Sequence, residues 1–270
     1  MAAVRSQEAI CRIVADGILK LTTKAFRKPD YNGVVVTEDM LLVTDYKACN
    51  LQLYSRRDGK LLSTSHRLES DPNGVCLISK TKVAVCLADR KIVILSFKSI
   101  DDVKLVKTLD VSTGFTWCYS VAKLNSDKLV VSGMNYDYML RWGVVSITDG
   151  RLDSTHNICI GNWTHLAIKD ITLYISCDTS DPTINGVHAY DIFNPHTHKF
   201  LYQHKELKIP WTIMADRDSV FVSDRNSNII HQLTDSGQLV TIHTVSSSLS
   251  GIFYDDQHGV LYTTSMYSNV

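Results

Sequence analysis

Aromatic side chains offer this 270-residue chain its clearest binding chemistry. Tryptophan rings suit sugar faces, flat heterocycles, ammonium groups and inserted peptide side chains. They are also enriched at binding hot spots. With their polar and aromatic neighbours, they give these candidate ligand-binding residues: Trp117, Trp163, Trp211, Trp142, Tyr136, Tyr138, Arg141, His165, Asn32 and Asn73.

Catalytic and metal-binding signatures are absent from the same sequence. It contains no G-x-S-x-G, H-E-x-x-H, Walker or G-x-G-x-x-G motif. His196 and His198 have a spacing that suits a metal, but no third ligand is identifiable. Residues 224–228 imitate the start of an EF-hand loop, yet Ile229 stands where that loop needs glycine. We therefore predict no catalytic residue, no metal and no cofactor.

The charge balance and the cysteines limit the class of protein. Lys plus Arg and Asp plus Glu number 28 each, so no global excess of charge attracts phosphate backbones or acidic membranes. The N-terminus has no apolar h-region and no run of 18 apolar residues occurs, which predicts neither secretion nor a membrane span. Seven cysteines without a C-x-x-C pair suit the reduced thiols of a cytoplasmic protein.

Short β-runs recur in a fixed order, with a period of about 40 to 48 residues. The second strand of each unit is the clearest, because it is short and rich in β-branched or aromatic residues. Hairpin turns follow with glycine at 59, 150 and 237, a residue type that tolerates positive φ. The predicted second strands are Leu41–Asp45, Val83–Leu87, Leu129–Gly133, Leu173–Cys177, Val220–Asp224 and Val260–Thr264.

This order predicts an all-β fold, a six-bladed β-propeller with four-stranded antiparallel blades. We expect a single domain over residues 1–270, with units at approximately 32–70, 71–113, 114–161, 162–209, 210–248, and 249–270 plus 1–31. The last unit stops after two strands, and residues 9–26 have the pattern of a third strand, a turn and a fourth strand. We therefore expect the N- and C-terminal strands to share the closing blade, so that deleting residues 1–28 leaves an unfolded or aggregating protein.

Three sequence features recur in the units. A Gly-Val or Gly-Ile pair opens the first strand at Gly33, Gly74 and Gly251, the second strand ends in Ser/Thr-Asp as at Asp224, and an Asn precedes the next strand, as at Asn228. This combination resembles NHL repeats, and the chain looks like the six-bladed propeller at the C-terminus of many tripartite-motif (TRIM) proteins. The resemblance implies protein or RNA partners. The RING, B-box and coiled-coil parts of TRIM proteins are absent, so no ubiquitin-ligase activity is carried over.

The resemblance is strong in units one, two, five and six and weaker in units three and four. We expect those two units to have longer loops between their second and third strands, at residues 135–142 and 178–185. Such a loop emerges on the same face of a propeller as the start of each first strand. Function is therefore expected where the repeat is broken.

The tryptophans have two interpretations. Trp117, Trp163 and Trp211 align at the start of first strands in adjacent units, where other units have Asn32 and Asn73. They either form an aromatic half-ring at the channel mouth or seal the seams between neighbouring blades. We favour the half-ring, because other units fill this position with Asn or Ser.

These features predict a non-enzymatic recognition module that binds a protein or peptide through its loop-rich, Trp-bearing face. RNA is the alternative partner, and the balanced charge makes protein the safer choice. The second hypothesis is a propeller enzyme, or a binder of small molecules or glycans, that uses the central channel mouth. A stoichiometric divalent ion in the purified protein would favour the enzyme.

Overall fold

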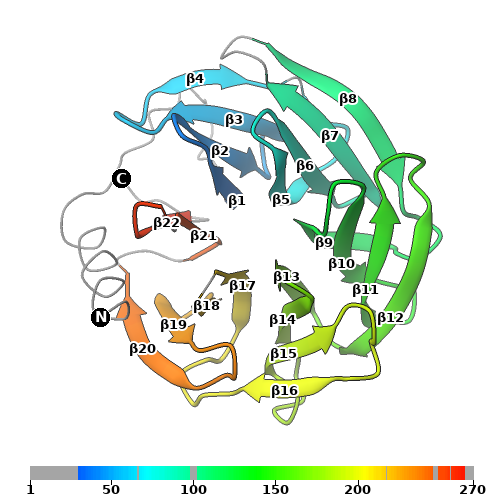
Figure 1. Cartoon of the computed structure of the whole chain (residues 1–270), viewed down its shortest axis with the longest axis vertical. Coiled ribbons are helices and arrows are strands. Elements are labelled where there is room, and N and C mark those ends of the chain that lie inside the picture. The colour runs from blue at the N-terminus through cyan, green and yellow to red at the C-terminus, as the bar shows by residue number, and fades with distance from the viewer. Residues whose placement is uncertain are drawn as a thin grey trace.

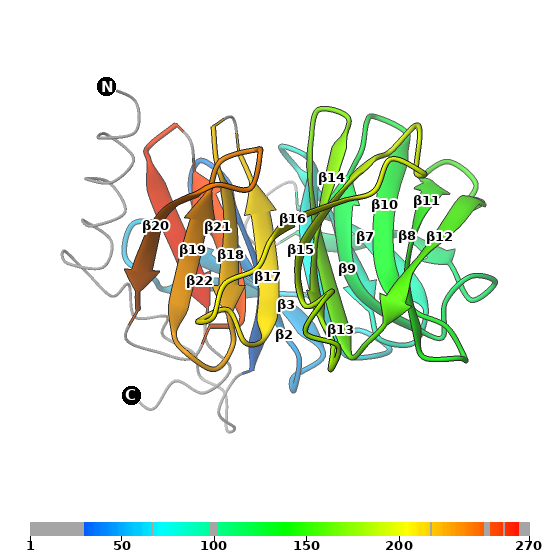
Figure 2. The ribbon, with the colours of Figure 1, turned by 90° about the horizontal axis from the view of Figure 1, so that it is seen from below.

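The structure is a computed structural model that describes residues 30–65, 67–97, 102–216, 218–245, 249–255 and 257–264. These residues form a β-propeller, in which antiparallel sheets stand around a central axis with the first strand of each sheet innermost (Figure 1). From the side, the sheets stand upright next to one another, so the ends of the strands make two opposite faces (Figure 2). The starts of the strands and the loops that connect them therefore lie on these two faces.

Five sheets have four strands each and are numbered here as blades one to five. Blade one has β1 (Tyr31–Val36), β2 (Met40–Asp45), β3 (Asn50–Ser55) and β4 (Leu61–Thr64). Blade two has β5 (Pro72–Ser79), β6 (Lys82–Leu87), β7 (Lys91–Phe97) and β8 (Val103–Asp110). Blade three has β9 (Trp117–Lys123), β10 (Lys128–Met134), β11 (Met139–Ser146) and β12 (Leu152–Ile160). Blade four has β13 (Trp163–Lys169), β14 (Thr172–Asp178), β15 (Gly186–Asp191) and β16 (Lys199–Tyr202). Blade five has β17 (Pro210–Ala215), β18 (Val220–Asp224), β19 (Ile229–Leu233) and β20 (Leu239–Thr244), and the last sheet has β21 (Gly251–Asp255) and β22 (Val260–Thr264).

The prediction of six four-stranded blades is wrong. Five blades have four strands, whereas the last sheet has only β21 and β22 in the described part of the chain. This sheet stands between blades five and one with β21 innermost (Figure 1). Residues 9–26, which were expected to complete it, lie outside the described residues, and so does the segment of the deletion prediction, 1–28.

All six predicted second strands are confirmed, each within one residue at either end. The five that belong to four-stranded blades are buried along most of their length, because both of their faces pack against neighbouring sheets. Gly59, Gly150 and Gly237 have φ angles of 68°, 77° and 85°. Glycine adopts this left-handed conformation without a steric penalty, so the predicted hairpin turns are confirmed as well.

The hydrophobic core is divided among the seams between neighbouring sheets. Leu42 of blade one shares a cluster with Val85 of blade two. The two-stranded sheet takes part on both of its sides: Phe221 of blade five shares a cluster with Leu261, and Tyr262 packs against the cluster of blade one. Apolar packing therefore continues around the whole ring.

Hydroxyl groups on second strands bond across the seams. Thr44 Oγ1 donates to the carbonyl of Asn73 in the next blade at 3.0 Å. Ser132, Ser176 and Thr264 make the same kind of bond to a carbonyl near the start of the next first strand. Each bond satisfies a backbone acceptor and holds one sheet in place against the next.

Replacing Thr44 by the isosteric valine should lower the free energy of unfolding by about 1–3 kcal/mol. Thr44 Oγ1 also accepts the N–H of Gly33 at 2.8 Å, so valine leaves a buried donor and a buried acceptor unpaired. The matched control is Thr108→Val on the exposed outer strand β8, which should change stability by less than about 0.5 kcal/mol. Urea denaturation measures both, and equal effects would contradict a role for the seam bond.

The loop between the second and third strands of blade three is shorter than predicted. It spans residues 135–138 only, and residues 139–142 already belong to β11. Tyr138 adopts a φ of 59° and closes the turn within this short span. The prediction for blade four is correct, since its loop spans residues 179–185.

The cysteines of the described residues do not form disulfide bonds with one another. Cys49, Cys76, Cys86, Cys118, Cys159 and Cys177 are all free thiols. No helix within the described ranges is long and apolar enough to span a membrane.

Candidate functional site

The first strands are innermost in the ring (Figure 1), and their pairing is irregular where they start. We call this end of the ring axis the channel mouth. Register shifts at the starts of β1, β5, β9 and β17 involve Asn32, Asn73, Tyr119 and Trp211, whereas β13 pairs regularly. A bulge leaves its extra residue unpaired and changes the direction of its side chain. The bulges therefore gather distinctive side chains at one mouth of the channel.

Aromatic rings from three adjacent blades form one half of this mouth. The centroid of the Trp163 ring lies 4.7 Å from that of Tyr119 and 5.1 Å from that of Trp211. The His165 ring lies 5.1 Å from Trp211, and all three contacts are tilted, as favourable aromatic pairs are. The repeat predicts that Trp117 lies beside Trp163, but the ring that contacts Trp163 from blade three is that of the bulged Tyr119. We call Tyr119, Trp163 and Trp211 the aromatic half.

Arg225 directly follows the second strand of blade five and lies over Trp211, with its guanidinium carbon 4.3 Å from the ring centroid. This is a cation–π contact within the protein itself. Burial, together with the positive charge of Arg225, lowers the pKa of His165 to about 3. Burial also raises the pKa of Asp178, opposed in part by its hydrogen bond with Asn162 and by Arg225. His165 is therefore a neutral imidazole at physiological pH.

Amide side chains form the other half of the mouth. Asn32 Nδ2 donates to Asn73 Oδ1 at 3.3 Å, and Asn73 Nδ2 donates to the carbonyl of Cys118 at 2.7 Å. The Ser250 hydroxyl donates to the carbonyl of Tyr31 and lies 3.4 Å from Asn32 Oδ1. We call Asn32, Asn73 and Ser250 the amide half. Its bonds run in one direction around the ring and use much of its hydrogen-bonding capacity internally.

Three ring nitrogens near the mouth have no hydrogen-bond partner. They are Nε1 of Trp117, Nε1 of Trp211 and Nε2 of His165. Trp211 and His165 are only 3% and 8% exposed, so bulk water does not reach these atoms freely. Unpaired buried polar atoms are rare in native proteins and mark places where a bound water or a polar ligand group would be stabilised.

Trp142 does not lie on this face, and the prediction that it lines a ligand site is wrong. Its side chain is fully buried in a cluster with Leu173 and Ile175. The Trp142 ring lies 4.4 Å from His156 and 6.0 Å from Tyr190. Because β11 begins at residue 139, Trp142 is part of the strand and fills the seam between blades three and four.

Tyr136 and Tyr138 do lie on the surface, where they are 78% and 68% exposed. They belong to the turn between β10 and β11, residues 135–139, which we call the tyrosine turn. Asn135 Oδ1 accepts the backbone N–H groups of Asp137 at 3.0 Å and Met139 at 2.9 Å. Tyr138 adopts the left-handed conformation, which costs a non-glycine residue about 1–2 kcal/mol. The turn is thus fixed by its own bonds and presents two phenol rings to solvent.

Ile160 and Arg141 lie close to the tyrosine turn, on β12 and β11. Ile160 is 66% exposed and is the register partner of Met139. Arg141 donates from Nε to Asn157 Oδ1 at 2.7 Å, and a terminal nitrogen lies 3.5 Å from the carbonyl of Gly114. Arg141 is therefore held on the side of blade three that faces blade two.

Asp224 serves the turn that follows its strand. Its Oδ1 accepts the N–H groups of Asn226 at 2.9 Å and Ser227 at 2.8 Å, and its Oδ2 accepts that of Ile209 at 2.8 Å. Residues 224–228 therefore form a polar turn stabilised by the Asp224 carboxylate, and their resemblance to an EF-hand loop is limited to the sequence. Among the residues that the structure describes, no three His, Cys, Asp or Glu side chains come together as metal ligands.

His196 and His198 do not act as a pair. His198 Nε2 lies 2.8 Å from His188 Nδ1, and His188 Nε2 lies 2.7 Å from the carbonyl of Ile184. A carbonyl only accepts, so neutral His188 carries its proton on Nε2 and accepts the Nε2–H of His198. The bond orders the connection between β15 and β16.

No protein-family model matches this chain, and no curated protein matches it in sequence. Solved structures do resemble it. A gluconolactonase from Xanthomonas campestris superposes with a TM-score of 0.71 at 14% identity. The superposition covers 89% of this chain and 84% of the gluconolactonase chain. A luciferin-regenerating enzyme gives a TM-score of 0.68 at 14% identity, covering 89% and 85%. A chain of a nidogen/laminin complex gives 0.63 at 13% identity, covering 86% and 82%. At these identities the likeness shows the β-propeller fold alone.

Proposed function

We propose that this chain is a non-enzymatic recognition propeller that binds a protein or peptide through the face carrying the tyrosine turn and the channel mouth. The observation that supports this most is the tyrosine turn, whose two phenol rings are 78% and 68% exposed on a backbone fixed by Asn135. Aromatic side chains dominate binding hot spots. A turn that is already ordered loses little conformational entropy when a partner binds.

The resemblance to NHL repeats supports a protein partner, with RNA as the alternative. Equal numbers of basic and acidic residues favour protein over a phosphate backbone. We also propose a cytoplasmic location, because the six described cysteines are free thiols and such thiols persist in reducing compartments.

A photo-crosslinking amino acid at position 136 should capture a partner in cells, whereas the same group at position 105 should not. Leu105 is a suitable control because it is 59% exposed on the outer strand of blade two, away from the proposed face. Mass spectrometry identifies the captured chain. Identical products from both positions would mean that the tyrosine turn is not a specific contact.

With the purified partner, the double variant Tyr136→Ala/Tyr138→Asn should weaken binding by about 30-fold or more, since a hot-spot side chain contributes at least about 2 kcal/mol. Asn at 138 keeps the left-handed backbone of the turn, because Asn tolerates positive φ. Leu105→Ser should leave the dissociation constant unchanged. Isothermal calorimetry measures all three, and unchanged binding by the double variant would refute the proposal.

A second candidate function is a small-molecule or glycan site at the channel mouth. The three unpaired ring nitrogens of Trp117, Trp211 and His165 are the observation that favours it. A ligand there should quench tryptophan fluorescence, and Trp163→Phe should weaken that ligand without changing partner capture at the tyrosine turn. A lowered melting temperature for Trp211→Phe with ligand binding intact would assign Trp211 to seam packing. Metal analysis of the purified protein separates metal-dependent hydrolysis from simple binding.

A further inference from the structure

The tyrosine turn is continuous with the loop of blade four. Ile160, the register partner of Met139, accepts a hydrogen bond from Thr179 Oγ1 through its carbonyl at 2.9 Å. Asn162 N–H donates to the carbonyl of Asp178 at 2.9 Å. Residues 135–139, Ile160 and the loop 179–185 therefore form one surface across the seam between blades three and four.

This surface carries two exposed carboxylates. Asp137 stands between the two tyrosines, and Asp181 lies in the loop of blade four. The N–H and the hydroxyl of Thr183 both donate to Asp181 Oδ1, at 2.8 Å and 2.7 Å, and lower the pKa of this carboxyl. Asp181 is therefore ionised at neutral pH. Its second oxygen, Oδ2, remains available to a ligand.

The nearest cations do not neutralise these carboxylates. Arg141 is engaged by Asn157 Oδ1 and the carbonyl of Gly114. Within the described residues, neither Asp137 nor Asp181 has a Lys or Arg nitrogen within 4.0 Å. The surface is thus aromatic and acidic at once.

We infer that this surface, formed by the tyrosine turn, Ile160 and Asp181, binds an arginine- or lysine-bearing segment of a partner protein. The inference rests on the proposed recognition function and names the chemistry of its partner. A guanidinium group stacks on phenol rings and pairs with carboxylates, so the surface offers both interactions to one side chain. Isolated carboxylates repel a phosphate backbone, which disfavours RNA at this place.

The test titrates the whole chain with two capped peptides, Gly-Arg-Gly-Arg-Gly-Arg and its Glu-containing counterpart. The arginine peptide should bind and the glutamate peptide should not. Asp137→Asn and Asp181→Asn should each weaken arginine-peptide binding about two- to fivefold, as expected for exposed ion pairs, and the double variant roughly tenfold. Raising the salt concentration from 50 to 500 mM should weaken it further.

Asp149→Asn is the matched control, because Asp149 is also an exposed turn carboxylate but lies in the turn between β11 and β12, at the other end of β11. It should leave peptide binding unchanged. Equal binding of both peptides, no binding of either, or the same loss in Asp149→Asn would overturn the inference. A single-stranded RNA that binds at this surface and is released by Tyr136→Ala would overturn it as well. Capture of a partner from position 136 without arginine-peptide binding would overturn the charge assignment and leave the recognition function standing.

Discussion

Acidification from pH 6.5 to about pH 4.5 should lower the free energy of unfolding, because each of three buried histidines contributes a loss of about 1.4 kcal/mol per pH unit. Burial lowers the pKa of His165 to about 3 and those of His188 and His231 to about 4. An unfolded histidine titrates near pH 6.5, so between these values the unfolded chain binds protons that the folded chain does not. Each of these histidines therefore lowers the free energy of unfolding by about 1.4 kcal/mol for each unit by which the pH falls. The stability is complete above pH 6.5 and is lost as the pH falls.

Urea denaturation at pH 7.5, 6.5, 5.5 and 4.5, followed by tryptophan fluorescence, measures this slope. Carboxylates with lowered pKa values, such as Asp110 and Asp153, titrate below this window. Asp30 and Asp178, whose pKa values burial raises, oppose part of the loss at its acidic end. His231→Gln removes one titrating ring and should reduce the slope by about 1.4 kcal/mol per pH unit. A stability that is flat from pH 6.5 to 4.5 would contradict burial of these rings as neutral groups.

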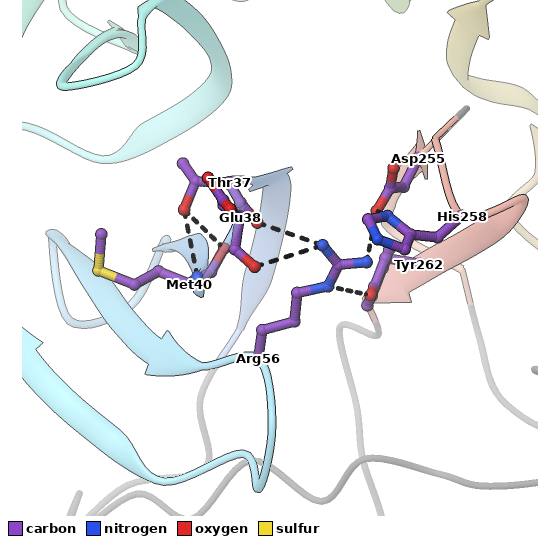
Figure 3. A network of polar contacts seen from close by, with 7 residues as sticks. All are labelled: Thr37, Glu38, Met40, Arg56, Asp255, His258 and Tyr262. Atoms are coloured by element: carbon purple, nitrogen blue, oxygen red, sulfur yellow. Dashed lines mark hydrogen bonds and ion pairs between the residues drawn. The ribbon is translucent and has the colours of Figure 1, made fainter.

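Replacing Arg56 by methionine should lower the free energy of unfolding by about 3–5 kcal/mol. A terminal nitrogen of Arg56 lies 2.5 Å from Asp255 Oδ2, and the two side chains are only 16% and 10% exposed. Arg56 Nε donates to the Tyr262 hydroxyl at 2.8 Å. Figure 3 shows the guanidinium reaching from blade one to both strands of the last sheet, with its remaining nitrogen directed at the carbonyls of Thr37 and Glu38. Methionine leaves the buried Asp255 carboxylate without its guanidinium partner, with the His258 Nδ1 atom, 2.9 Å from Oδ2, as its remaining side-chain contact.

The matched control for Arg56 is Lys60→Met. Lys60 and Asp58 form an ion pair of 3.0 Å in the same blade, but their side chains are 75% and 42% exposed, so the loss should stay below about 1 kcal/mol. The double variant Arg56→Met/Asp255→Leu should be more stable than Arg56→Met alone, because no unpaired charge remains buried. Equal losses for Arg56→Met and Lys60→Met in urea denaturation would show that this contact does not hold the last sheet to blade one.

The second strands were the most predictable part of the fold. Strands buried on both faces need short runs of β-branched and aliphatic residues, and Val220–Asp224 is such a run in the sequence itself. Which strands complete a sheet is a different question. Hydrogen bonding between strands far apart in the chain leaves no local pattern, and the described residues form five four-stranded blades and a two-stranded sheet where six four-stranded blades were expected.

The sequence repeat predicted which positions of neighbouring blades meet at the candidate site. It did not predict which way every side chain points. Trp163 and Trp211 meet as the repeat predicts, but a bulge, which no composition rule reveals, places Tyr119 beside them. The burial of Trp142 had a visible signal. Leu140 and Trp142 share one side of β11 and Met139 and Arg141 the other, so alternation along the strand pointed Trp142 inward.

The guanidinium of Arg225 covers one face of the Trp211 ring, and the chain keeps it there. A side chain linked to its own binding surface by a short segment competes at an effective concentration on the order of millimolar. An ammonium or guanidinium ligand for Trp211 must therefore displace a covalently attached rival that lies 4.3 Å from the ring centroid. A weak cationic ligand at Trp211 would compete with Arg225 for the same ring face, whereas the phenol rings of the tyrosine turn have no such internal competitor among the described residues.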